Sequence, residues 1–131
     1  MFLSSPAMAD TLCWVTVTNE NFETEVIEAS KNKPVIVILG SEPNSEERVS
    51  DFYLIETQAK AQKFYGNGYK VIVGRVEKNG QIYDRTNIIR VESYSTPPII
   101  LGAKNGKLTI GSLFVDESDF EVTKNLLNNL S

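Results

Sequence analysis

Residues 34–40 read Pro-Val-Ile-Val-Ile-Leu-Gly, and this stretch decides the fold class. It carries five consecutive apolar residues, Val35 to Leu39, between a proline and a glycine that both break regular structure. A short, unbroken, β-branched run of this kind is typical of a central strand that is buried on both faces. Such strands occur mainly in sheets that carry helices on each side. The stretch therefore predicts an α/β fold.

Strand and helix patterns alternate on both sides of this central strand. Apolar periodicity and breaker residues predict, in chain order, a strand over 12–17, a helix over 18–30, the central strand over 35–39, a helix over 46–64 and a strand over 69–76. The later sequence predicts an antiparallel hairpin of strands 99–101 and 107–114 around the turn Lys104-Asn105-Gly106, then a helix over 116–130 capped by Asp116 or Ser118. Residues 77–94 fit either a short helix or a hairpin at Lys78-Asn79-Gly80, and the overall alternation favours the helix.

The helix over 46–64 has a specific predicted orientation. Its apolar residues form a wide stripe that is expected to face the core: Val49, Phe52, Tyr53, Ile55, Ala59 and Phe64. Glu56, Lys60 and Lys63 fall outside this stripe. Gly66-Asn67-Gly68 is expected to end the helix.

The chain has 131 residues, which suits one domain, expected over 12–131 after a disordered or leader-like tail over 1–11. Residues 5–9, Ser-Pro-Ala-Met-Ala, resemble the end of a secretory signal peptide, but only Met1-Phe2-Leu3 precede them as an apolar stretch. This favours a cytoplasmic location. A periplasmic or secreted one follows if residues 1–9 are the remnant of a longer leader.

Composition excludes several classes of function. The net charge of −4 and the scattered lysines argue against nucleic acid as the partner, and no apolar run is long enough for a membrane span. There is no histidine and a single cysteine, Cys13, so neither an internal disulfide nor histidine-based acid/base catalysis is available. The usual nitrogen and sulfur ligands of zinc are missing as well. We therefore expect no metal and no cofactor.

Four segments resemble the thioredoxin family in their order and spacing. They are Thr18-Asn19-Glu20-Asn21-Phe22, Pro34-Val35-Ile36-Val37, Thr96-Pro97-Pro98 and Lys104-Asn105-Gly106-Lys107. The resemblance covers roughly residues 12–130. It implies a thioredoxin-like fold: a central mixed sheet flanked by helices, with a C-terminal β-hairpin and helix. It also implies a cis-proline at Pro97.

The redox motif of that family is missing. Its Cys-x-x-Cys would fall near Asn44-Ser45-Glu46-Glu47, where there is no thiol. Asn44 or Ser45 is instead expected to cap the following helix, with Glu47 completing a capping box. Glu42, Glu46 and Glu47 would repel an anion such as the carboxylates of glutathione. No disulfide oxidoreductase activity is expected.

With redox activity excluded, the binding of a polypeptide is the function that the sequence favours. The candidate binding residues are Ser41, Pro43, Asn44, Ser45, Thr96 and Pro97. In the family, the residue before the cis-proline pairs with an extended peptide by β-addition, which needs no cysteine; alternatively, Pro97 only fixes a tight turn. We predict a redox-inactive protein-binding module of adaptor or chaperone type that binds a protein or peptide partner. The alternative is a glutathione- or thiol-dependent small-molecule enzyme, for which Cys13 is the one thiol, although a cysteine in a strand is typically a small buried hydrophobe.

Overall fold

The computed structural model describes residues 19–40, 50–75, 98–109 and 111–130. In chain order the helical elements are α2 (Asn19–Phe22), the π-helical η1 (Glu23–Glu28), the 3₁₀ turn η2 (Ala29–Lys31), α3 (Asp51–Tyr65) and α5 (Ser118–Asn128). The strands are β1 (Val35–Gly40), β2 (Lys70–Arg75), β3 (Ile99–Lys104), β4 (Lys107–Leu108) and β5 (Ser112–Leu113). The expected strand over 12–17 and the expected helix within 77–94 lie outside the described residues.

The described strands form one mixed sheet of five strands, in the order β2-β1-β3-β4, with β5 also paired to β3. β1 is parallel to β2 and antiparallel to β3, so it lies in the interior of the sheet. All six of its residues are buried, as the unbroken apolar run predicts. The predicted mixed sheet with a C-terminal hairpin is therefore confirmed at this level.

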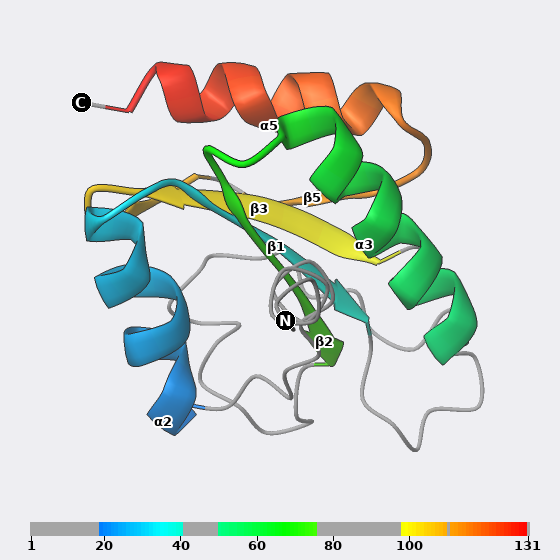
Figure 1. Ribbon diagram of the computed structural model, residues 1–131, viewed down its shortest axis with the longest axis horizontal. Helices are drawn as coiled ribbons and strands as arrows, with labels where there is room; N and C mark the ends of the chain where they lie inside the picture. Colours follow the sequence, from blue (N-terminus) through cyan, green and yellow to red (C-terminus); the bar gives the residue numbers. More distant parts are fainter. Residues whose placement is uncertain (1–18, 41–49, 76–97, 110, 131) are drawn as a thin grey trace, which may run out of the picture.

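Helices cover both faces of this sheet (Figure 1). Because side chains alternate along a strand, Val35, Val37 and Leu39 pack on one face with Phe22 and Val26 of the first helical segment. Ile36 and Ile38 point to the other face, toward α3 and α5. That second layer holds an aromatic cluster in which Phe120 stacks on Phe114 and contacts Tyr65 edge-on, with ring centroids 5.0 Å and 5.8 Å apart. Burial raises the pKa of the Tyr65 hydroxyl, which donates a hydrogen bond to the Phe120 carbonyl at 2.6 Å.

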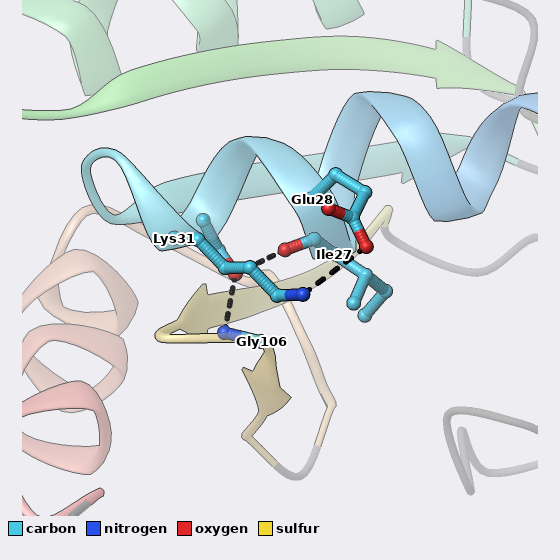
Figure 2. Close-up of polar contacts among 5 residues, drawn as sticks. Ile27, Glu28, Lys31 and Gly106 are labelled. Carbon is cyan, nitrogen blue, oxygen red and sulfur yellow. Dashed lines mark hydrogen bonds and ion pairs between the residues drawn. The ribbon is translucent and has the colours of Figure 1, made fainter.

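The helical segment over 19–31 matches the prediction and is tied to the distant hairpin. Asn105 and Gly106 have φ values of 54° and 84°, as the predicted Asn-Gly turn requires. The Ser30 hydroxyl donates to the carbonyl of Ile27 and accepts from the Gly106 amide at 2.8 Å (Figure 2). The Asn105 amide donates to the Ser30 carbonyl at 2.9 Å. One buried serine thus connects the end of η2 to the β3–β4 turn.

Ser30→Ala is expected to lower the free energy of unfolding by about 1–2 kcal/mol, because it leaves the Gly106 amide without its hydroxyl acceptor. Urea denaturation of the two proteins measures the difference. Lys31→Ala is the matched control: its ion pair with Glu28 is 3.2 Å long and exposed, so a change within about 0.5 kcal/mol is expected. Equal effects of the two substitutions would contradict the proposed role of Ser30.

The orientation predicted for the helix over 46–64 is wrong. Phe52, Ile55, Ala59 and Phe64, assigned to the core, are exposed. The buried residues of α3 are Leu54, Thr57, Gln58, Ala61 and Tyr65. Hydrogen bonds explain why polar residues occupy the core face: Gln58 Nε2 donates to the Val71 carbonyl at 3.1 Å, and Thr57 Oγ1 to the Tyr53 carbonyl at 2.8 Å.

The start of α3 also differs from the prediction. The helix begins at Asp51 and not at Glu46, and its N-cap is Ser50, whose hydroxyl accepts a hydrogen bond from the Tyr53 amide at 3.0 Å. The cap predicted at Asn44 or Ser45 is therefore wrong for this helix. The C-terminal end agrees with the prediction, since α3 ends at Tyr65 and Gly66 follows with a φ of 80°.

The C-terminal part is close to its prediction, with one interruption. The strand expected over 107–114 is split into β4 and β5, and between them Thr109 exchanges two hydrogen bonds with the Gly102 backbone. At the start of α5, the Asp116 carboxylate accepts from the Ser118 amide, and Asp119 accepts from the Asp116 amide. The Ser118 hydroxyl and amide lower the pKa of the Asp116 carboxyl. The N-cap of α5 is Glu117, which makes no side-chain capping hydrogen bond, so the cap predicted at Asp116 or Ser118 is wrong by one residue.

Candidate functional site

Three chain segments meet where the parallel strands end. Gly40, the last residue of β1, pairs with Arg75, the last residue of β2. On the other side of β1, Leu39 pairs with Ile99, the first residue of β3. Figure 1 shows the arrowheads of β1 and β2 at the same end of the sheet, which we call the carboxyl edge. In open α/β sheets this edge is the usual place for a ligand.

The predicted binding residues belong to segments that start from this edge. Ser41 directly follows Gly40, and Pro97 directly precedes Pro98, which lies next to the start of β3. Ser41, Pro43, Asn44, Ser45, Thr96 and Pro97 themselves lie outside the described residues, as do Cys13 and the peptide bond before Pro97. The sheet register therefore locates only Gly40 and Pro98, the described residues that flank the two segments with the candidate residues.

A buried arginine lies at the same edge. The side chain of Arg75 is 4% exposed, and its Nε and Nη2 donate to Asp51 Oδ1 at 2.9 Å and 2.6 Å. Asp51 is the first residue of α3, and its side chain is 59% exposed. The pair joins the end of β2 to the start of α3 through charge-assisted hydrogen bonds. A carboxylate in the first turn also interacts favourably with the helix dipole.

Gly40 allows this pair to lie against the strand. A Cβ built on Gly40 would lie 2.8 Å from Leu54 Cδ1 and 3.0 Å from Arg75 Nη1. Both contacts are tight, so a larger residue at position 40 would have to shift the end of the Leu54 side chain or the Arg75 guanidinium. The glycine predicted only as a strand breaker is needed here for close packing.

Sequence reasoning missed Arg75 and Asp51. Arg75 ends the strand Lys70–Arg75, whose other residues are mostly small or apolar, and a charged residue at the end of a buried strand is the signal that points to it. The helix predicted over 46–64 places Asp51 in its interior, although Ser50-Asp51 is a common helix start. The error for Asp51 comes from placing the helix start too early.

Two kinds of feature are absent from the described residues, a metal-binding cluster and a membrane-spanning helix. Within the described ranges, no cluster of three cysteine, aspartate or glutamate side chains is placed to hold a metal ion. In the same part of the chain, no helix has the length and apolar character needed to cross a membrane.

Comparison with known proteins is informative about the fold alone. No protein-family model matches the chain, and no curated protein matches it. The chain is similar to a designed protein of known crystal structure, with a TM-score of 0.56 and 16% sequence identity. The match covers 93% of this chain and 96% of the designed protein.

Proposed function

We propose that this chain is a redox-inactive, thioredoxin-like module that binds an extended segment of a partner polypeptide at the carboxyl edge of β1. The observation that carries this proposal is the pairing of Leu39 with Ile99, which brings the end of β1 and the start of β3 together. The candidate residues Ser41 and Pro97 lie within two positions of these paired residues in sequence. Two segments that start from one edge can form the two sides of a peptide site.

The strand arrangement supports the thioredoxin-like assignment. β2 and β1 are parallel, β3 is antiparallel to β1, and a hairpin and a helix end the chain. Helices pack on both faces of this sheet. This agrees with the arrangement that the sequence resemblance implies.

The absence of a second thiol supports a binding role over disulfide exchange. Reversible disulfide exchange through one protein needs a nucleophilic and a resolving cysteine, and this sequence has Cys13 alone and no histidine to activate it. The Arg75–Asp51 pair beside the edge joins the end of β2 to the start of α3 next to the proposed site.

Site-specific photo-crosslinking tests this proposal. A benzophenone amino acid at position 41 or 96 is expected to crosslink the chain to a permanently unfolded polypeptide, such as carboxymethylated lactalbumin. The control position is Asn67, an exposed residue between α3 and the start of β2, at the opposite end of that strand. Crosslinks at Asn67 that equal those at positions 41 and 96 would contradict a peptide site at the carboxyl edge.

An insulin-reduction assay separates the proposal from its alternative. We expect the chain to reduce insulin no faster than the dithiothreitol background, because it lacks the second cysteine. Reductase activity that is lost on Cys13→Ser would contradict the proposal and favour a thiol-dependent enzyme.

A further inference from the structure

One side of α3 presents apolar side chains to solvent. Phe52 is 75% exposed and Ile55 is 42% exposed, and Ala59 continues the same side of the helix. Together with the charged residues Glu56, Lys60 and Lys63 they form a surface that we call the α3 outer face. At 100° per residue, this face is directly opposite the buried residues Leu54 and Ala61. The helix is therefore apolar on two opposite sides, of which the sheet covers one.

The spacing of the apolar residues is that of a helix-packing seam. Phe52, Ile55 and Ala59 are three and four residues apart, and half-buried Gln62 continues the series. This is the a/d spacing of helices that pack side by side. The small side chain of Ala59 near the centre allows a second helix to approach closely. Covering the exposed Phe52 side chain with another apolar surface is favourable in free energy, because it removes apolar area from water.

The charges on this face are self-complementary. Glu56, Lys60 and Lys63 follow one another along one edge of the face at spacings of four and three residues. In a dimer with a two-fold axis perpendicular to α3, the two α3 helices run in opposite directions. The charged side of one helix face then lies beside the same charged side of the other. Glu56 of one copy then lies opposite Lys60 and Lys63 of the other. Lys60 also lies 3.6 Å from Glu117 of α5, and its side chain stays half exposed.

We propose that the α3 outer face is a homodimer interface, in which the α3 helices of two copies of this chain pack antiparallel. The apolar seam supplies the attraction, and the acidic and basic ends of the edge select the antiparallel direction. Each copy contributes the same residues, as an isologous contact requires. The site is on α3 and does not involve the candidate peptide-binding residues.

Sedimentation velocity of the purified full chain over a range of concentrations measures this association. The wild type is expected to form dimers, and Ile55→Glu and Phe52→Glu are each expected to weaken dimerisation at least about tenfold. Val122→Glu is the matched control, because Val122 is a similarly exposed apolar residue on α5, away from this face. Circular dichroism checks that each variant is folded. A wild type that stays monomeric at all concentrations, or a Val122→Glu variant that is weakened as much as Ile55→Glu, would overturn the proposal.

Charge exchange tests the antiparallel direction. Glu56→Lys makes the edge wholly basic, whereas Lys60→Glu with Lys63→Glu makes it wholly acidic, so each protein alone is expected to dimerise more weakly than wild type. A mixture of the two is expected to form heterodimers, and all three substitutions in one chain restore the homodimer. A mixture that shows no preference for the heterodimer overturns the antiparallel assignment. Since these measurements involve no polypeptide ligand, failure of the dimer and failure of the proposed function are separate results.

Discussion

Replacing Phe120 by alanine is expected to lower the free energy of unfolding by about 3–5 kcal/mol. Phe120 is 1% exposed and contacts Phe64, Tyr65 and Phe114, so its removal leaves a cavity where α5 packs on the sheet and on α3. A domain of this size is stable by only about 5–15 kcal/mol, so much of its stability would be lost. The midpoint of urea denaturation, with the slope held in common, measures the change.

The control for Phe120 is on the same helix. Val122→Ala removes apolar atoms from an exposed position of α5, where a change within about 0.5 kcal/mol is expected. A loss below about 1 kcal/mol for Phe120→Ala would mean that this aromatic cluster contributes little to the core.

The second large effect is expected at the carboxyl edge. Asp51→Ala should destabilise the protein by about 2–3 kcal/mol, because it removes the carboxylate that accepts two charge-assisted hydrogen bonds from the buried Arg75 guanidinium. Arg75→Met should cost less, within about 1 kcal/mol, because the remaining Asp51 side chain is largely exposed and water can hydrate it.

The double variant makes this asymmetry testable. If the two residues act as a pair, the cost of Asp51→Ala should nearly vanish in an Arg75→Met background. Chemical denaturation of the wild type, the two single variants and the double variant gives the coupling energy. Additive costs would show that Asp51 stabilises the start of α3 independently of Arg75.

Much of the secondary structure can be predicted from the sequence, because its signals are local. The unbroken run from Val35 to Leu39 predicts an interior strand, and Asn105-Gly106 predicts the hairpin turn, since few other residues adopt its dihedral angles. The order of these elements leads to a mixed sheet with helices on both faces. None of this needs knowledge of contacts between distant residues.

The orientation of α3 cannot be predicted in this way. Hydrophobicity favoured the side with Phe52 and Ile55, whereas the buried side carries Thr57 and Gln58. Whether a glutamine can be buried depends on an acceptor elsewhere in the chain, here the Val71 carbonyl on β2. The ion pair of Arg75 with Asp51 depends in the same way on the packing of α3 beside β2. For the candidate site, the sequence identified segments that flank one edge of the sheet, but not the charged pair beside it.

The hydrogen bond between Ser30 and Gly106 also affects how the protein is made. Its partners are 76 positions apart, so the first helical segment leaves the ribosome long before the turn that it contacts. Until that turn is synthesised, the Ser30 hydroxyl has no hairpin to bind, and β1 has no β3 beside it. The nascent chain can therefore pair β1 with β2 early, but the β3 side of this apolar strand stays open until the last third of the sequence is synthesised.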